Sequence, residues 1–284
     1  MKLSKIFALL LALCLISSAA CAATFTDAHG NVIELDDSLE AYAAVTLVGA
    51  DNAARQGETN LGDLWADALR WFAVSGEINA AFDEDDVKAG NDRIAVDADH
   101  VVALWNGGNL RADIAEGAFG AEALAEVLPF PNKVAVVYMT GAQLLETLEA
   151  ASQGLPYTAE TADACASLMQ VSGLTYTVDT TKAYDALEAY GDHWFTAGSV
   201  SRVRIDNVNG QPFDAEATYA VVTSNANFNG MDSSYVLKAA AEASEQSAVT
   251  TAVVRDVVFR FIAAELNHQV GEAYAAPQGR LTVL

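Results

Sequence analysis

Apolar positions along this chain follow two different spacings, which predict helices and strands. Residues 61–72 place apolar side chains on one helical face, and Thr59 or Asn60 is available as the N-cap. Continuous apolar runs at residues 101–105 and 134–139 are typical of buried strands. Thr140 and Gln143 have the spacing of a capping box, so a helix is expected to begin directly after the second run.

The second half of the chain continues this pattern. Apolar and polar residues alternate at 174–178 and 203–205, and Asn209-Gly210 predicts a hairpin turn before a strand at 219–223. Between these strands, residues 180–199 form an excursion that carries Tyr184, Tyr190, Trp194 and Phe195. These aromatic rings either cap a pocket or fold back on the sheet. Residues 254–266 predict a closing helix with one face toward the core.

The turn after the first buried run carries the strongest candidate chemistry. Its sequence is Asn106-Gly107-Gly108-Asn109-Leu110-Arg111-Ala112-Asp113. Paired glycines let the backbone take positive φ and turn N–H groups outward, and the guanidinium of Arg111 offers a fixed fork of donors beside them. This combination suits a small anion such as phosphate. The alternative interpretation is a tight turn with a solvated arginine.

Composition and net charge disfavour some classes of binding partner. The chain has 284 residues, 52% hydrophobic content and five prolines, which favours a compact fold with a sizeable core. Its formal net charge is −23. Nucleic-acid polymers and anionic membrane surfaces are therefore poor partners, because Lys and Arg are too few to neutralise them.

The N-terminus has the order of a secretory signal peptide. Lys2 and Lys5 precede an apolar run at residues 6–16, and small residues follow. Cleavage after Ala22 predicts an exported protein in the periplasm, outside the cell or at the cell surface. Cleavage before Cys21 predicts a lipoprotein, and lipidation there is the expected link to a membrane. Neither a disulfide framework nor a cysteine metal site is expected, because Cys165 is the remaining thiol.

The sequence predicts no metal site and no cofactor in this chain. Residues 24–35 indicate two short strands around a glycine turn, and they contain the pair Asp27 and His29. Binuclear metal sites need further histidines and carboxylates, whereas the other histidines stand outside any paired-ligand context. The acidic run at residues 83–86 lacks the spacing of a calcium loop.

Six blocks in a fixed order resemble the C-terminal domain of the bacterial and animal 5′-nucleotidase family. The resemblance covers about residues 58–282 and implies an α/β fold of mixed sheets with packed helices. We therefore expect a signal peptide at 1–22, a short N-terminal β segment at 23–57 and a 5′-nucleotidase C-terminal-like domain at 58–284. The blocks are Glu58-Thr59-Asn60-Leu61-Gly62-Asp63-Leu64, Asn106 to Ile114, Leu128-Pro129-Phe130 through Leu144, Gln170-Val171-Ser172-Gly173-Leu174-Thr175-Tyr176, Val208-Asn209-Gly210-Gln211-Pro212 with Thr218-Tyr219, and Pro277-Gln278-Gly279-Arg280.

The resemblance implies which residues hold a substrate. In that family, arginines that include the one in the Asn-Gly-Gly block hold the nucleotide, and two aromatic rings sandwich its base. Leu168 stands at the first of these aromatic positions, and Phe228 is a shifted replacement for the second. Base–aromatic stacking is worth about 1–3 kcal/mol per base, so these changes weaken base binding. The implied substrate-binding residues are Asn106, Gly107, Gly108, Arg111, Gln170, Phe228 and Asp232.

Three functions remain open at this point. The first is an exported module that recognises a nucleotide or another small phosphorylated ligand and is not catalytic alone, because the metal ligands of the family's metallophosphoesterase domain are missing from the sequence. The second is the recognition subunit of a 5′-nucleotidase that acts with a separate metallophosphoesterase. The third is a structural or protein-interaction domain whose pocket has decayed. No catalytic residue is assigned in this chain.

Overall fold

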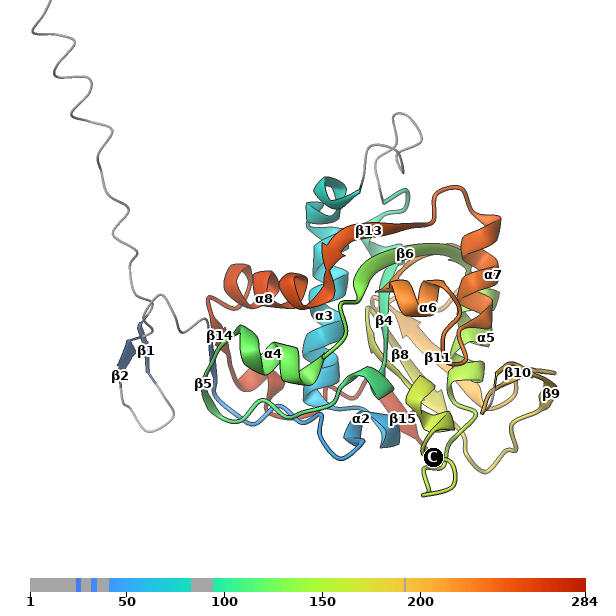
Figure 1. Ribbon diagram of the computed structural model, residues 1–284. Coiled ribbons are helices and arrows are strands. Elements are labelled where there is room, and N and C mark those ends of the chain that lie inside the picture. The colour runs from blue at the N-terminus through green and yellow to red at the C-terminus, as the bar shows by residue number, and fades with distance from the viewer. Residues whose placement is uncertain (1–23, 27–31, 35–40, 83–93, 192) are drawn as a thin grey trace, which may run out of the picture.

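A five-stranded mixed sheet forms the centre of the protein (Figure 1). The computed structural model describes residues 24–26, 32–34, 41–82, 94–191 and 193–284. Strands β4 and β12 run parallel, and the other neighbouring pairs are antiparallel. The expected α/β fold with mixed sheets and packed helices is confirmed. The strand order is β13 (Ala248–Val253), β6 (Lys133–Thr140), β12 (Thr218–Ser224), β4 (Val101–Asn106) and β7 (Met169–Ser172).

Alternate side chains of the central strands enter two hydrophobic clusters, one on each face of the sheet. On β4, Val101, Ala103 and Trp105 join the first cluster, whereas Val102 and Leu104 join the second. A strand buried on both faces is apolar at every position, which explains the continuous run in the sequence. Each face therefore needs its own cover.

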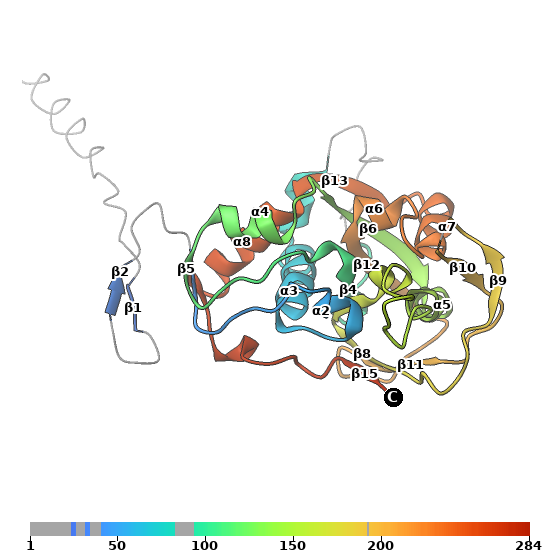
Figure 2. The same ribbon diagram turned by 60° about the horizontal axis from the view of Figure 1, so that its bottom comes forward.

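Helices cover the first face. They are α3 (Asn60–Val74), α8 (Val254–Ala264) and α4 (Ala121–Val127), which lie together in both Figure 1 and Figure 2. Thr59 is the N-cap of α3, and its side-chain oxygen accepts a hydrogen bond from Gly62 N–H at 3.0 Å. Leu61, Leu64 and Trp65 are fully buried under the sheet. The amphipathic helix expected at 61–72 is confirmed.

Two helices and a second sheet cover the other face. The helices are α5 (Gly141–Ala151) and α7 (Tyr235–Ala243), and the sheet has the order β11 (Val203–Val208), β8 (Leu174–Val178) and β15 (Leu281–Val283). The capping box at the start of α5 is confirmed, because the Thr140 side chain accepts from Gln143 N–H at 3.3 Å while the Gln143 side chain accepts from Thr140 N–H at 2.9 Å.

Shorter elements complete the fold. A small sheet contains β14 (Gln269–Val270), β3 (Ala41–Ala43) and β5 (Gly117–Phe119), and two separate hairpins pair β1 (Thr24–Thr26) with β2 (Val32–Glu34) and β9 (Ala186–Ala189) with β10 (Phe195–Ala197). The short helices are α2 (Ala53–Gln56), α6 (Asn225–Phe228) and the 3₁₀ helices η1 (Glu77–Ala81), η2 (Ala98–His100), η3 (Gly107–Asn109), η4 (Ala164–Ser167) and η5 (Glu272–Tyr274).

Residues 41–57 belong to the body of the domain. Ala41, Ala43, Leu47 and Ala54 are fully buried in the first hydrophobic cluster. Strand β3 pairs with β5 on one side and with β14 on the other. The N-terminal segment that we expected at 23–57 is thus, from residue 41 onward, part of the same core as the rest of the chain.

The hairpin predicted around Asn209-Gly210 is wrong as a strand pairing. Asn209 and Gly210 do take positive φ values of 48° and 78°, as the turn requires. The turn joins Val208 to Gln211, but β11 and β12 belong to different sheets. The reason is burial: β11 alternates buried and exposed residues, which suits a sheet with one wet face, whereas β12 is buried along nearly its whole length and fits between β4 and β6.

Several expectations concern residues outside the described part. They are the signal peptide at 1–22, lipidation at Cys21, the Asp27 and His29 pair, and the acidic run at 83–86. Within the described ranges, the structure contains no helix with the length and apolar character needed to cross a bilayer.

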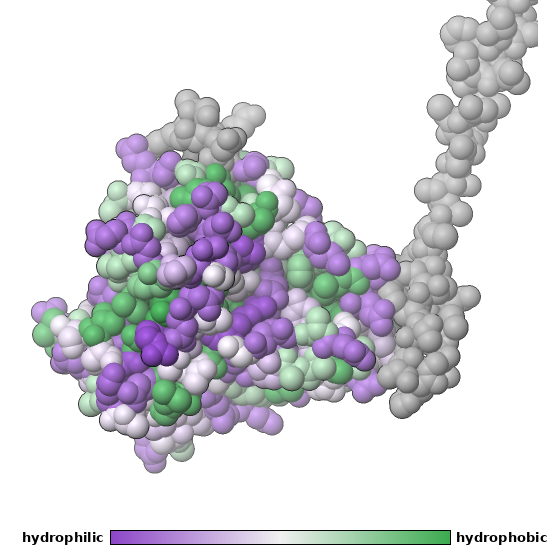
Figure 3. Space-filling view, turned by 180° about the vertical axis from the view of Figure 1, so that it is seen from behind, coloured by the Kyte–Doolittle hydropathy of each residue, from purple (hydrophilic) through white to green (hydrophobic). Residues whose placement is uncertain are grey.

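The surface mixes polar and apolar side chains, as Figure 3 shows for one face. The exposed apolar side chains come from scattered positions, such as Val48, Val74, Leu187 and Met231. Single exposed apolar residues are normal on a protein surface. The search for a functional site therefore depends on charge and hydrogen bonding.

Candidate functional site

The turn after β4 is tight because its glycines admit two neighbouring segments. Neither Gly107 nor Gly108 has a positive φ, contrary to our expectation. A Cβ on Gly107 would lie 1.9 Å from the Ala54 carbonyl oxygen of α2, and a Cβ on Gly108 would lie 2.7 Å from the Ala166 Cβ of η4. The glycines are needed for close packing, which brings α2 against the turn.

Two backbone amides of this turn are used inside the protein. Gly107 N–H donates to Leu168 O at 2.7 Å, and Arg111 N–H donates to Val127 O at 2.9 Å. The expectation that the turn directs these amides outward is therefore wrong. These two amides are therefore not available to an anion.

Charged side chains converge on this turn from three parts of the chain. Arg111 is exposed, and its guanidinium carbon lies 5.6 Å from the centre of the Phe130 ring. Partial burial lowers the pKa of Arg111, and the positive charge of Arg55 lowers it further. Burial raises the pKa of Asp232, while Arg55 and Arg111 act in the opposite direction. The mutual effects place both guanidiniums and this carboxylate within electrostatic reach of one another.

Amide side chains fix the carboxylate in this group. Asn106 Nδ2 donates to Asp232 Oδ2 at 2.6 Å, and Asn109 Nδ2 donates to Asn106 Oδ1 at 2.8 Å. We call Arg55, Asn106, Arg111 and Asp232 the turn cluster. The structure thus brings together three of the residues implied by the sequence, and it adds Arg55.

Arg55 was not among the residues predicted from the sequence. It lies on α2, within the segment that we had assigned to a separate N-terminal part. Its Nη1 donates to Ala162 O at 2.9 Å and lies 3.7 Å from Asp163 Oδ1. The sequence offers one weak signal, which is a lone arginine just before the first family-like block of an acidic chain.

Gln170, on strand β7, supports the turn cluster by holding the helix α2 in place. It is buried, and its Nε2 donates to Ala54 O at 3.0 Å and to Gly57 O at 2.8 Å. Its Oε1 accepts from Thr59 N–H at 3.0 Å. These bonds tie α2 to β7 and to the start of α3. The structure therefore places Gln170 where it positions the helix that carries Arg55.

The two positions expected to stack a base lie in the core on the α5 side. Leu168 is fully buried there. Phe228 ends α6 and packs, partly buried, against the same cluster. The aromatic ring that the structure places beside Arg111 is Phe130, which is 39% exposed.

The excursion at 180–199 folds back on the helices of the second face. Phe195 N–H donates to Gln153 Oε1 at 2.9 Å, just beyond α5. Ala197 N–H donates to the hydroxyl of Tyr235, the first residue of α7, at 3.0 Å. Of the two roles left open for this excursion, packing is the one that these contacts describe.

A second charged group ties the C-terminus to α3, and we call it the C-terminal clamp. It consists of Glu58, Asp63, Asp67 and Arg280. Arg280 lies 2.8 Å from Asp67 Oδ2 through Nη2 and 3.7 Å from Asp63 Oδ1 through Nε. Leu281 N–H donates to Glu58 Oε2 at 2.9 Å. The clamp therefore holds the segment that enters β15.

One carboxyl of the clamp, that of Asp63, has a strongly raised pKa. Asp63 is fully buried, and burial together with the negative charge of Glu58 raises its pKa to about 8, although Arg280 opposes the shift. Oxygens Glu58 Oε1 and Asp63 Oδ1 are buried without another hydrogen-bond partner. A proton on Asp63 that is shared with Glu58 satisfies both oxygens, so at neutral pH Asp63 contributes a hydrogen bond to the clamp in place of a buried charge.

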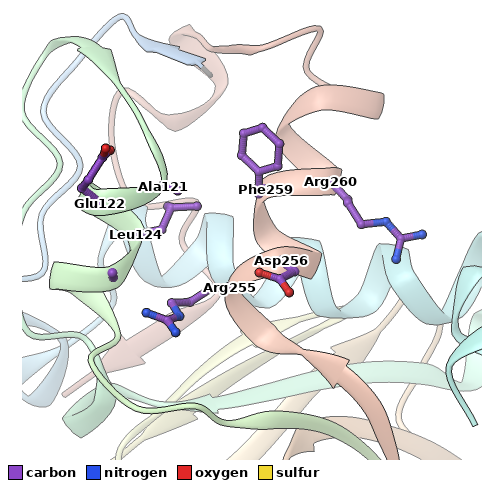
Figure 4. Close-up of a pocket in the computed structure, with 8 residues that line it drawn as sticks. Ala121, Glu122, Leu124, Arg255, Asp256, Phe259 and Arg260 are labelled. Carbon is purple, nitrogen blue, oxygen red and sulfur yellow. The ribbon is translucent and has the colours of Figure 1, made fainter. Parts of the chain in front are cut away.

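Two concave pockets are lined by residues outside the turn cluster. Figure 4 shows one of about 520 Å³ between α4 and α8, where Glu122 and Asp256 are balanced by Arg255 and Arg260. Another pocket, of about 560 Å³, is lined by residues around α2, the start of α3 and the segment 275–277. Neither lining includes the turn cluster. In the part of the chain that the structure describes, no three His, Cys, Asp or Glu side chains gather as metal ligands.

Known proteins share both the sequence and the fold of this chain. The sequence-family model described as "5′-nucleotidase, C-terminal domain" matches residues 40–239 of this chain. A trifunctional nucleotide phosphoesterase of Bacillus subtilis is 28% identical over 188 residues, which are 65% of this chain and 10% of that protein.

Solved structures extend the similarity. A 5′-nucleotidase precursor from Thermus thermophilus superposes with a TM-score of 0.62 at 28% identity, over 87% of this chain and 40% of that one. The NAD nucleotidase of Haemophilus influenzae has a TM-score of 0.57 at 14% identity, over 92% of this chain and 48% of that one. At that identity the likeness concerns the fold alone. The chain spans less than half the length of these relatives.

Proposed function

This chain belongs to the family of 5′-nucleotidase C-terminal domains, and from this premise we propose that it recognises a nucleotide or another small phosphorylated ligand at the turn cluster. In this proposal the phosphate lies against Arg55 and Arg111. The chain acts as a recognition module and does not hydrolyse the ligand alone.

The convergence of two arginines on one turn is the observation that carries the proposal. The whole chain has 15 Lys and Arg against 38 Asp and Glu, so two guanidiniums around Asp232 form a local exception, even though Arg55 also pairs with Asp163 at 3.7 Å. Guanidinium groups keep their charge at neutral pH and donate hydrogen bonds in the plane of the group. A phosphate dianion offers matching acceptors.

Asp232 adds a hydrogen-bond acceptor to the proposed site. Its carboxylate is held by Asn106 and is set between charges of opposite sign. In the absence of a ligand it is a counter-ion for the arginines. With a ligand bound, its free oxygen is an acceptor for a hydroxyl group, as a sugar phosphate carries. The cluster thus favours a phosphate joined to a polar, hydroxylated group.

Base recognition is expected to be weak. Leu168 is not aromatic and is fully buried in the core, and Phe228 packs, partly buried, against the same core, so the two-ring sandwich implied by the family resemblance is incomplete here. We therefore propose that different bases bind with similar affinity. The phosphate and its neighbouring hydroxyls supply most of the binding free energy.

A second candidate function is the recognition subunit of a 5′-nucleotidase with a separate metallophosphoesterase. It is favoured by the similarity to the 5′-nucleotidase precursor of Thermus thermophilus, in which the part that matches this chain is 40% of a longer protein. In that case the partner supplies the divalent metals and the attacking water, and the turn cluster holds the substrate for it.

We also propose that the protein is exported. Lys2, Lys5 and the apolar run at residues 6–16 support a signal peptide. Processing at Cys21 would attach a lipid, and processing after Ala22 would release the domain. Mass spectrometry of the mature N-terminus from the native host distinguishes these two outcomes and the uncleaved chain.

Calorimetric titration of the protein with AMP, inorganic phosphate and adenosine tests the proposed function. We expect AMP and phosphate to bind and adenosine to bind much more weakly, because adenosine lacks the anion. Each titration is repeated with divalent metal while phosphate release is assayed. Binding of adenosine equal to that of AMP would contradict the proposal. Metal-dependent phosphate release would contradict the noncatalytic role, and absence of all binding would favour a decayed pocket.

A further inference from the structure

The β9–β10 hairpin reaches the turn that carries Asp232. Tyr190 directly follows β9, and its hydroxyl donates to Gly230 O at 2.7 Å. Gly230 stands two residues before Asp232 in the chain. The Tyr190 ring also lies 5.7 Å from the ring of Tyr235, at the start of α7. The hairpin therefore contacts the turn at 229–235 near both of its ends, and Figures 1 and 2 show β9 and β10 beside α5 and α7.

The turn takes a backbone conformation that needs support. Asp232 has φ of 54°, a region that non-glycine residues rarely occupy, and Gly230 has φ of 87°. A Cβ on Gly230 would lie 2.3 Å from the Tyr190 hydroxyl oxygen. The hydroxyl thus fits against the turn only because residue 230 is glycine.

The position of this turn sets the geometry of the turn cluster. Asp232 receives the 2.6 Å hydrogen bond from Asn106, and its charge acts on Arg55 and Arg111. A shift of the turn moves the carboxylate relative to both guanidiniums. Tyr190 is outside this group of charges, but its hydrogen bond restrains the segment from which Asp232 extends.

We propose that Tyr190 is a positioning residue, whose hydroxyl fixes the Asp232 turn and thereby sets the affinity of the turn cluster for a small phosphorylated ligand. This inference rests on the proposed function, because it assumes that the ligand binds beside Asp232. The excursion that carries Tyr190 thus contributes to recognition without contacting the ligand.

Tyr184 provides a matched control in the same excursion. Its hydroxyl also donates to a backbone carbonyl at 2.7 Å, but that carbonyl belongs to Phe195 of β10. Tyr184→Phe and Tyr190→Phe each remove one hydroxyl and keep the aromatic ring. Only the second variant releases the Asp232 turn.

Titration of the full chain with AMP and with inorganic phosphate tests the effect on affinity. A hydrogen bond to a neutral group contributes about 1 kcal/mol, so we expect Tyr190→Phe to weaken binding about three- to tenfold. Tyr184→Phe is expected to bind like the wild type. The inference would be overturned if Tyr190→Phe bound with wild-type affinity, or if both variants were weakened equally.

Hydrogen exchange of residues 229–235 gives a readout that does not depend on the ligand. We expect faster exchange in this segment for Tyr190→Phe and unchanged exchange for Tyr184→Phe. If the wild type binds neither AMP nor phosphate, the proposed function fails, and exchange alone decides whether the hydroxyl restrains the turn. Unchanged exchange in Tyr190→Phe would overturn that restraint in either case.

Discussion

Arginines meet carboxylates at two places in this molecule, the turn cluster and the C-terminal clamp, and the two differ in charge balance and in exposure. At the turn cluster two arginines face two carboxylates, because Asp163 lies 3.7 Å from Arg55 and adds to Asp232, and Arg111 is exposed. The clamp has one arginine for three carboxyls, and Asp63 is fully buried. The first group is balanced in charge and has one guanidinium open to solvent, whereas the second has more carboxyls than arginines.

The hydrogen bonds lead to the same distinction. Arg280 donates to Val171 O at 2.9 Å and to Asp67 Oδ2 at 2.8 Å, so its donors hold the protein together. Arg111 lies with its guanidinium against Phe130, which leaves the N–H edge of the group available to an anion. Exposure and donor use are therefore the features by which we distinguish the proposed binding site from the structural clamp, although both contain the same residue types.

Loss of the clamp arginine is expected to lower stability strongly. Arg280→Met leaves Asp63 and Asp67 without their positive partner, so we expect the free energy of unfolding to fall by about 3 kcal/mol. Arg260→Met is the matched control, because Arg260 is exposed and pairs with Glu77 at the surface, where a pair contributes about 0–1 kcal/mol. Urea unfolding measures both. Equal losses would remove the distinction between clamp and surface pair.

The pH dependence of stability tests the second group, the C-terminal clamp, through its carboxyl Asp63. The pKa of Asp63 rises from 3.8 to about 8 on folding, so between these values the folded state holds a proton that the unfolded state has lost. This contribution to the free energy of unfolding is fully present below pH 3.8 and is lost as pH rises toward 8, by up to about 1.4 kcal/mol per pH unit.

Asp63→Asn tests this assignment. An amide at this position keeps a donor toward Glu58 and an acceptor for the backbone, but it does not titrate. We expect the variant to lose most of the fall in stability between pH 4 and pH 8 when urea unfolding is repeated across that range. Asp256→Asn, on the exposed face of α8, is a control that should retain the wild-type slope. An unchanged slope in Asp63→Asn would place the titrating group elsewhere.

The smallest effect concerns the ring beside Arg111. Phe130→Leu removes a cation–π contact worth about 0.5–1 kcal/mol, so we expect phosphate affinity to fall about two- to fivefold with little change in stability. Phe195→Leu, at another exposed aromatic residue, is the control in the same titration. A larger loss of stability than of affinity would assign Phe130 to folding.

Local sequence signals predicted most of the framework. The cap at Thr59, the capping box at Thr140 and the doubly buried strand at 101–105 each depend on a few neighbouring residues, and all are present. The pairing after Asn209-Gly210 was not predictable from the turn alone. The choice of partner strand depended on burial of both faces of β12, which is a property of the whole sheet.

The candidate site was predicted in part. Asn106, Arg111 and Asp232 were selected through the family resemblance, and the structure brings them together. Arg55 was missed because α2 approaches the turn only in three dimensions, through Gly107 and the bonds of Gln170. The reason for the glycines was also misjudged, since close packing leaves no mark in the sequence that differs from a need for positive φ.

Titration of inorganic phosphate into Arg111→Ala tests the central claim most directly. Arg204→Ala is the control, because Arg204 is an exposed arginine on β11 paired with Asp206 at 2.7 Å. Loss of a charged hydrogen-bond donor costs about 1.5–3 kcal/mol, so we expect phosphate to bind Arg111→Ala at least tenfold more weakly than the wild type, with Arg204→Ala unchanged. Equal phosphate affinity for the wild type and Arg111→Ala would contradict the assignment of the turn cluster as the anion site.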